Sequence, residues 1–231
     1  MSFDFPLIVD SIPKMLVGIG LTLELLFLSG ILGLALAIAL LLMRISGRWY
    51  LAAPTMAYIY IFRGTPILVQ IFIIYYGLPQ LEFVRDSIFW PVFREPYGCA
   101  IIALTLNTGA YVSEILRGGV LGVDRGLKEA GAALGLSVRH RFIYITSPIA
   151  IRLCLPAYSN DVISLMKSTA LASTITLLDM MGIARTIVAE TYAPYEVFIS
   201  LMFIYLILTW MIQRTFGWIE KRMSRHVRSE A

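Results

Sequence analysis

Two apolar segments of the sequence carry polar side chains of types that could bind a charged solute. In the segment 97–116, Asn107, Tyr111 and Glu114 follow one another at i, i+4 and i+7, which places them on one face of a helix. The segment 153–178 holds a second such set: Asn160, Asp161, Ser164, Lys167 and Ser168. A carboxylate attracts a cation and an ammonium group attracts an anion. The two faces could therefore line one pathway.

Other roles for these charges stay open. Ionisable side chains at membrane depth are costly and normally face a cavity or a partner. Glu114 could pair with Arg117, and Lys167 with Asp161, as packing ion pairs or as contacts with another subunit.

A third polar feature is Arg63, which is followed by Gly64, Thr65 and Pro66 within an apolar stretch. Glycine and proline together break or kink a helix and free backbone carbonyls beside the charge. Such discontinuities are typical of gates and binding sites in transporters. We therefore treat Arg63, Gly64, Thr65 and Pro66 as a candidate gate.

The composition indicates that these elements lie in lipid. Of the 231 residues, 58% are hydrophobic and only 15% are charged, with a mean hydropathy of +0.79. A soluble domain of this size has about a quarter of its residues charged. The numbers exclude a disordered chain as well. Cys99 and Cys154 are isolated in apolar stretches and match no metal-ligand spacing, so we expect buried thiols and neither a disulfide nor a metal site.

Five stretches are long and apolar enough to span a bilayer, which predicts an all-α polytopic membrane protein. They are 15–43, 51–78, 97–116, 153–178 and 197–213. Residues 1–14 precede the first span, and a basic tail, 216–231, follows the last. Between the second and third spans, residues 79–96 contain both signs of charge and several aromatic residues, which favours a short interfacial helix or a lid.

The distribution of basic residues predicts the orientation of the spans. Five spans put the termini on opposite sides, and the side richer in Lys and Arg is cytoplasmic. Four basic residues, Lys14, Arg85, Arg94 and Arg185, lie on one side. Thirteen lie on the other: Arg44, Arg48, Arg117, Arg125, Lys128, Arg139, Arg141, Arg152, Arg214, Lys221, Arg222, Arg225 and Arg228. We expect a periplasmic N-terminus and a cytoplasmic C-terminus, and the positive charge then needs no nucleic acid as partner.

The segment 117–152 between the third and fourth spans is too organised for a simple connection. Apolar residues recur at helical spacing from Leu127 to Leu134, and we place Glu129 in the first turn of this helix. Gly135 fits a C-cap, Ser137 can cap a second short helix, and Pro148 would limit that helix. The pattern predicts a helix-turn-helix elbow on the cytoplasmic face.

This elbow resembles the EAA loop of bacterial ABC-importer permeases, whose pattern is Glu-Ala-Ala-x3-Gly-x9-Ile-x-Leu-Pro. Glu129, Ala130, Gly135, Ile145 and Pro148 match it in type and spacing. Gly131 replaces the second alanine, and Ser147 replaces the leucine. Three further stretches resemble the branch that imports polar amino acids, including the histidine, glutamine, arginine and opine systems. They are Phe62-Arg63-Gly64-Thr65-Pro66 with Leu68-Val69-Gln70, the run from Asn107 to Gly118, and Lys167-Ser168-Thr169-Ala170-Leu171.

The resemblance, which covers residues 15–215, implies the type I ABC importer permease fold in a bacterial inner membrane. It further implies four kinds of partner: a homologous permease, identical or paralogous; two cytoplasmic ATPase subunits; a periplasmic solute-binding protein; and the lipid bilayer. In that family the loop enters a groove on the ATPase, so Glu129, Ala130, Gly131, Gly135, Ile145 and Pro148 take the coupling role by position. For an amino acid or opine as cargo, Lys167 suits the carboxylate and Glu114 the cation.

The chain itself is expected to hold no cofactor and to catalyse nothing. It contains no Gly-x4-Gly-Lys-[Ser/Thr] phosphate loop, so ATP and Mg²⁺ would be bound by the partner ATPase. Two alternatives are an ion-coupled secondary transporter and a membrane receptor or scaffold. The first often has duplicated halves, which five spans do not give, and would have no use for the elbow. The second would not need two polar faces.

Overall fold

The computed structural model describes residues 5–223, and these form helices without any β-strand. The α-helices are α1 (Phe5–Leu16), α2 (Ile19–Ile45), α3 (Trp49–Gly64), α4 (Ile67–Phe72), α5 (Glu82–Arg85), α6 (Trp90–Phe93), α7 (Pro96–Leu121), α8 (Arg125–Ala133), α9 (Val138–Arg141), α10 (Ser147–Thr169), α11 (Met180–Thr191) and α12 (Pro194–Met223). Two π-helical turns, Ile73–Gly77 and Phe142–Thr146, and two 3₁₀ segments, Leu78–Gln80 and Ala170–Ile175, complete the helical content of this part of the chain.

Within the described residues, four helices are long and apolar enough to cross a membrane, and a bent pair makes the fifth crossing. The four are Ile19–Ile45, Pro96–Leu121, Val138–Ile175 and Pro194–Met223. The bent pair, Trp49–Gly64 with Ile67–Gln80, turns by 105°. The prediction of an all-α membrane protein with about five spans is confirmed. The predicted 51–78 span is broken at the expected Gly64 and Pro66.

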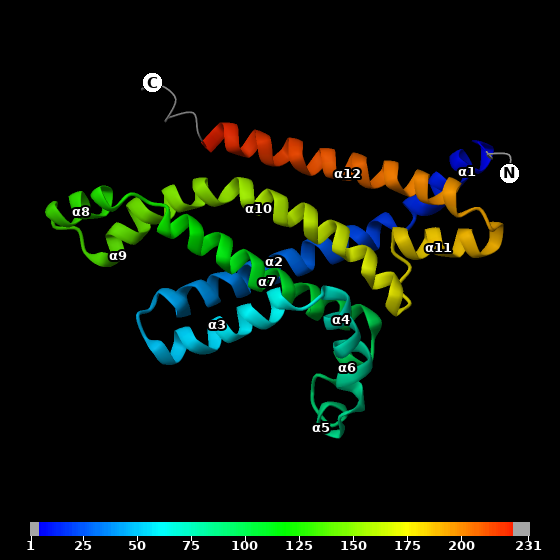
Figure 1. The fold of residues 1–231 in the computed structure, drawn as a ribbon, viewed down its shortest axis with the longest axis horizontal. Coiled ribbons are helices and arrows are strands. Elements are labelled where there is room, and N and C mark those ends of the chain that lie inside the picture. The colour runs from blue at the N-terminus through cyan, green and yellow to red at the C-terminus, as the bar shows by residue number, and fades with distance from the viewer. Residues whose placement is uncertain (1–4, 224–231) are drawn as a thin grey trace.

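Helices α2 and α7 pack against each other along most of their length and form the centre of the bundle (Figure 1). Small residues allow this close approach. A β-carbon added at Gly33 would lie 2.8 Å from Thr108, and one added at Gly109 would lie 2.7 Å from Leu36. Helix α10 packs on α7 and α12, while α3 packs on the other side against α2 and α7. Tight packing of small residues is how helices associate where lipid removes the hydrophobic driving force.

The two ends of the bundle differ in what they carry (Figure 1). Helices α8 and α9 lie at one end, together with the last turns of α12, and we call this the α8 end. Helices α1 and α11 lie at the opposite end, which we call the α11 end. Helices α4, α5 and α6 project from the side of the bundle. The predicted tail is helical as far as Met223, and its remainder lies outside the described residues.

The predictions missed helices α1 and α11, because each has only 12 residues and neither reaches the length of a span. The side chain of Asp179 caps α11 by accepting a hydrogen bond from the Gly182 amide at 3.0 Å. The neighbouring Met180 amide donates to Thr22 Oγ1 on α2 at 3.3 Å. Helix α11 is thus fastened to the start of α2. The segment 79–96, predicted to hold a short interfacial helix or a lid, contains two short helices, α5 and α6.

The elbow is present, with two corrections. Helix α8 begins at Arg125, so Glu129 lies beyond the first turn, and Asp124 is the capping residue, accepting from the Gly126 amide at 2.6 Å. Pro148 does not end the second helix, because Val138–Ile175 is one continuous helix. The π-helical turn at Phe142–Thr146 ends two residues before Pro148, whose ring nitrogen carries no N–H for the regular helix ladder. Gly135 and Ser137 act as predicted: Gly135 has φ +76°, and Ser137 Oγ accepts from the His140 amide at 3.4 Å.

Candidate functional site: the break between α3 and α4 and the α8–α9 elbow

The chain is held in its break between α3 and α4 by the buried side chain of Gln70. Its Nε2 atom lies 2.9 Å from the Phe62 carbonyl, 3.0 Å from the Thr65 carbonyl and 2.8 Å from Thr65 Oγ1. Thr65 and Pro66 are extended, so the helix ladder leaves these carbonyls without partners. Gln70 supplies donors that water cannot supply in a membrane.

Asn107 fastens this break to α7. Its Nδ2 donates to Gln70 Oε1 at 3.0 Å and to the Phe62 carbonyl at 3.3 Å. Tyr58 on α3 donates from its hydroxyl to the Leu106 carbonyl at 2.6 Å. Asn107, predicted as a pathway residue, therefore also has a structural role. The role of Gln70 was not predicted, although the residue stands in a stretch that carried the family resemblance.

Beside the break lies a hollow of about 220 Å³ between α3, α4, α7 and α10. The lining residues are Thr65, Pro66, Ile67, Asn107, Thr108, Tyr111, Asp161, Ser164, Leu165 and Ser168. Asp161 is the one charged residue of this lining, and within the described chain no basic side chain forms an ion pair with it. The remaining polar groups are hydroxyls and an amide. We call this cavity the Asp161 hollow.

Seven of the twelve predicted pathway and gate residues meet at this hollow, and five do not: Asn160, Lys167, Glu114, Arg63 and Gly64. Asn107, Tyr111, Asp161, Ser164 and Ser168 line it together with Thr65 and Pro66. Asn160 and Lys167 are exposed and belong to none of its walls. The Lys167–Asp161 pair is not formed among the described residues. Sequence spacing missed Thr108, Ile67 and Leu165, since they look like ordinary helix packing residues.

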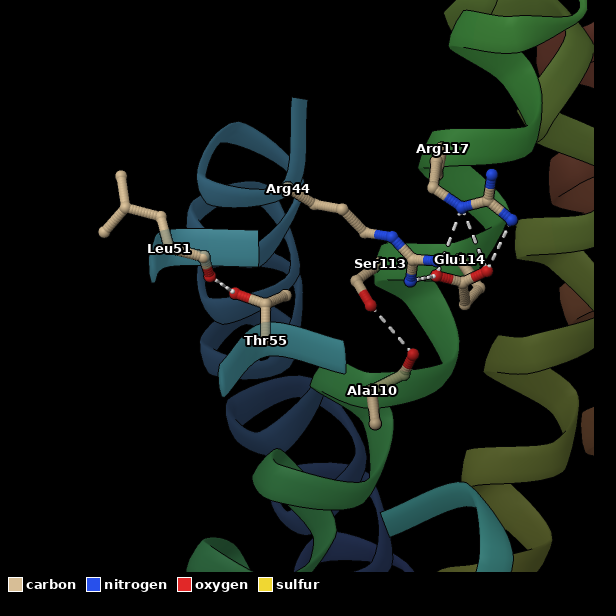
Figure 2. A network of polar contacts seen from close by, with 7 residues as sticks. All are labelled: Arg44, Leu51, Thr55, Ala110, Ser113, Glu114 and Arg117. Carbon is tan, nitrogen blue, oxygen red and sulfur yellow. Dashed lines mark hydrogen bonds and ion pairs between the residues drawn. The ribbon is translucent and has the colours of Figure 1, made fainter. Parts of the chain in front are cut away.

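Glu114 does not line the Asp161 hollow and is held in place by two arginines, as Figure 2 shows. It forms an ion pair with Arg44 at the end of α2 and another with Arg117, whose Nη2 lies 2.8 Å from Glu114 Oε2. Arg117 Nε donates to the same oxygen at 3.0 Å. The pairing of Glu114 with Arg117, which the sequence left open, is present. Glu114 therefore joins α2 to α7.

Arg63, the charged member of the candidate gate, lies over the ring of Tyr111 with its Cζ 5.2 Å from the ring centroid. The Tyr111 hydroxyl donates to the Arg63 carbonyl at 3.4 Å. Arg63 is exposed, and no carboxylate of the described chain lies within ion-pair distance of it. Gly64 follows it with open space around its α-carbon.

The elbow packs α8 against the helix that follows it. Gly131 is buried, and a β-carbon there would lie 2.6 Å from Ile145 Cδ1. Arg141 Nη1 donates to the Lys128 carbonyl at 3.3 Å, and Lys128 Nζ donates to the Val120 carbonyl of α7 at 3.2 Å. Glu129, Ala130 and Pro148 are exposed. The elbow thus presents an outward surface while its inner face stays closed.

This combination of spans and elbow agrees with comparisons against known proteins. A family model described as "binding-protein-dependent transport system inner membrane component" matches residues 29–225. The chain belongs to this family. The permease is also similar to the octopine transport system permease protein OccM of Rhizobium meliloti, with 47% identity over 97% of this chain and 94% of that protein.

Other relatives carry related names. The nopaline transport system permease protein NocM of Agrobacterium fabrum is 44% identical over 98% of the permease and 94% of its own length. The histidine/lysine/arginine/ornithine transport system permease protein HisM of Escherichia coli is 42% identical over 91% of the permease and 89% of its own length. These are all names of transport subunits, and the family is one of permeases and not of enzymes.

Solved structures have the same fold. The "crystal structure of an amino acid ABC transporter with histidines" superposes with a TM-score of 0.85 and 32% identity, covering 96% of the permease and all of that chain. An inward-facing structure of the MetNI methionine ABC transporter gives a TM-score of 0.70 at 20% identity, which shows the fold alone. As an inner membrane component of a binding-protein-dependent system, the permease works with a solute-binding protein and an ATPase.

Proposed function

We propose that the permease carries polar or cationic amino acids, or opines of the octopine and nopaline type, through the Asp161 hollow. The observation that supports this best is the Asp161 carboxylate, which faces the hollow without a basic partner among the described residues. An ammonium or guanidinium group is the natural counter-ion for such a carboxylate. The names of the octopine, nopaline and histidine relatives agree with cargo of this chemistry.

Further parts of the proposal concern the assembly and its orientation. We place the α8 end in the cytoplasm and the N-terminus in the periplasm, as the excess of basic residues in the connections at the α8 end predicts. A second permease, identical or paralogous, would stand beside this one, and two ATPase subunits that bind ATP and Mg²⁺ would lie below the elbow. A periplasmic binding protein would deliver the cargo at the α11 end.

The elbow would transmit ATP-driven closure to the spans. Glu129 and Ala130 are exposed on α8, and Glu129 has no ion-pair partner in the described chain, which leaves both available to the ATPase. Gly131, Gly135, Ile145 and Pro148 shape the elbow that presents them. Lys128 then links α8 back to α7 through the Val120 carbonyl.

Replacing Asp161 tests the cargo pathway. In the complete complex, reconstituted in proteoliposomes with its binding protein, Asp161→Asn should lower arginine uptake about tenfold or more, since it removes the counter-charge. The matched control is Asp10→Asn, an exposed carboxylate on α1, which should leave uptake unchanged. Equal uptake by the Asp161 variant and the wild type would contradict the proposed pathway.

Glu129→Lys tests the coupling surface. The reversed charge should abolish the stimulation of ATP hydrolysis by the liganded binding protein. The thermal stability of the free permease should stay unchanged, because Glu129 is exposed and forms no ion pair with the other described residues. If ATP hydrolysis is still stimulated in this variant, Glu129 has no coupling role.

Cysteines introduced at exposed Ser46 and Ile88 report the orientation of the permease in the membrane, since the native cysteines are buried. Labelling of Ser46→Cys from the periplasm would contradict the proposed cytoplasmic position of the α8 end.

A further inference from the structure

A second hollow lies near the Asp161 hollow. It has a volume of about 560 Å³ and is lined by Arg44, Met56, Ile59, Tyr60, Arg63, Gly64, Tyr111 and Glu114. Tyr111 is the residue shared by the two linings. We call this second cavity the arginine hollow. Tyr111 therefore belongs both to a cavity lined by an acidic residue and to one whose charges are mainly basic.

The charges around the arginine hollow do not balance. Three arginines accompany the single carboxylate of Glu114: Arg44 and Arg63 line the hollow with it, and Arg117 pairs with it. Two of them, Arg44 and Arg117, are engaged by direct ion pairs with it (Figure 2). Arg63 is the third: its guanidinium lies over the face of Tyr111 and forms no ion pair within residues 5–223. The group as a whole therefore carries an excess of positive charge, and Arg63 has hydrogen-bond donors to spare.

Lipid is not the medium that this surface faces. Arg63 lies one residue before the end of α3, about 20 Å along the helix from Trp49, and so well inside the membrane. A guanidinium at that depth faces a water-filled path or a partner and not hydrocarbon. A contact with an aromatic face contributes only about 0.5–1 kcal/mol at an exposed site, which does not offset the cost of placing a charge there. We therefore expect an anion to bind the Arg63 guanidinium.

The order of the polar groups along α7 indicates that the anion would be part of a solute leaving the Asp161 hollow. Asn107, Tyr111 and Glu114 share one face of α7, and a rise of 1.5 Å per residue separates the first from the last by about 10 Å. A solute that leaves the Asp161 hollow towards the α8 end meets Tyr111 and Arg63 next, and then Glu114 with Arg44 near the mouth.

We propose that the arginine hollow is a second station of the pathway, in which Arg63 binds the carboxylates of the cargo after its cationic group leaves Asp161. This inference rests on the proposed function. A guanidinium presents paired donors that match both oxygens of a carboxylate. Amino acids and opines share at least one carboxylate, and the opines carry more, so Arg63 would favour the opines in particular.

The experiment uses cargoes that differ in carboxylate number. Arginine has one carboxylate, octopine has two and nopaline has three, and all three share the guanidinium. Uptake of each is measured with the complete complex in proteoliposomes, for the wild type, Arg63→Gln and Arg63→Lys. Arg48→Gln is the control, because Arg48 is exposed at the start of the same helix and lines neither hollow.

The expected result is a graded loss. Arg63→Gln should lower nopaline uptake about tenfold or more and arginine uptake about threefold, as expected when charged hydrogen bonds to the cargo are lost. Arg63→Lys should recover most of the loss, and Arg48→Gln should match the wild type. ATP hydrolysis stimulated by the liganded binding protein should stay at the wild-type rate in Arg48→Gln.

Two results would overturn the second station. An equal loss for all three cargoes would show that Arg63 supports packing or pairs with the neighbouring permease. Unchanged uptake of all three would show that no carboxylate binds there. If the wild-type complex transports none of the three, the proposed cargo is wrong. The proposed carboxylate site at Arg63 is then wrong as well, because it depends on that cargo. That failure is visible before any variant is measured.

Discussion

The elbow and the α3–α4 break both redirect the chain, yet they are built from different kinds of contact. Within the elbow, Lys128 and Arg141 are 13 residues apart, and its caps join residues only two or three positions apart. The break depends on α7, through Asn107, which lies 37 residues from Gln70 and 45 from Phe62. The elbow is therefore a local module that can move as a unit. The break is fixed to the centre of the bundle and moves only with it.

The largest effect should come from removing the long-range partner of the break. Gln70→Leu keeps the side-chain volume but leaves the Thr65 carbonyl without its hydrogen bond, and it reduces the Phe62 carbonyl and the Asn107 amide to the single 3.3 Å bond between them. Each buried unsatisfied group costs about 1–3 kcal/mol, so the variant should lose about 3 kcal/mol or more of stability. Thermal unfolding of the purified permease in detergent measures the loss.

The control for this variant is Gln80→Leu. Gln80 is exposed and donates one hydrogen bond, to the Tyr76 carbonyl at 2.8 Å. Its replacement should change stability by less than about 0.5 kcal/mol. If Gln70→Leu and Gln80→Leu unfold at the same temperature, the break does not depend on α7 and the contrast between the two regions fails.

The second effect in size concerns the closed inner face of the elbow. Gly131→Leu would drive its side chain into Ile145 and Arg141, so it should separate α8 from the following helix and reduce stimulated ATP hydrolysis about tenfold, while the bundle, measured by thermal unfolding, loses little.

Gly131→Ala is the sharper companion of that variant. The nearest atom to its added β-carbon is the tip of the flexible Ile145 side chain, which can turn away. Alanine should therefore be accepted, with a gain in helix stability of up to about 1 kcal/mol, as the family pattern's second alanine also suggests. A severe loss of coupling in this variant would mean that the elbow has no room to adjust and is not an independent module.

The smallest effect separates turn strain from coupling. Gly135 has φ +76° and Gly47 has φ +72°, and neither has an atom near its missing β-carbon. Alanine at either position should cost about 1–2 kcal/mol, through backbone strain alone. Both variants should unfold earlier by the same amount, but only Gly135→Ala should also weaken ATPase stimulation. Equal ATPase stimulation in the two variants would show that the backbone conformation of Gly135 does not affect coupling.

The same contrast explains what could be predicted from the sequence. Gly135 and Ser137 were assigned correctly because caps are set by residues a few positions away. The break was located by Gly64 and Pro66, but its partners Gln70 and Asn107 come from separate elements, and spacing does not reveal such pairs. Helical spacing placed Lys167 and Asn160 beside Asp161, whereas only Asp161 turns into the hollow, since one face of a helix covers a wide arc. Pro148 was interpreted as a stop because the π-helical turn before it has no local signature.

The continuity of the helix from Val138 to Ile175 has a mechanical consequence. Its 38 residues make a helix about 55 Å long along its axis, nearly twice the thickness of the hydrocarbon core. One end of this helix belongs to the elbow, and Asp161 stands about 35 Å along it. A tilt of about 5° pivoted at the elbow would carry the Asp161 carboxylate sideways by about 3 Å, the length of one hydrogen bond. A small rotation of this helix would therefore be enough to move the Asp161 carboxylate out of hydrogen-bond reach of a bound cation.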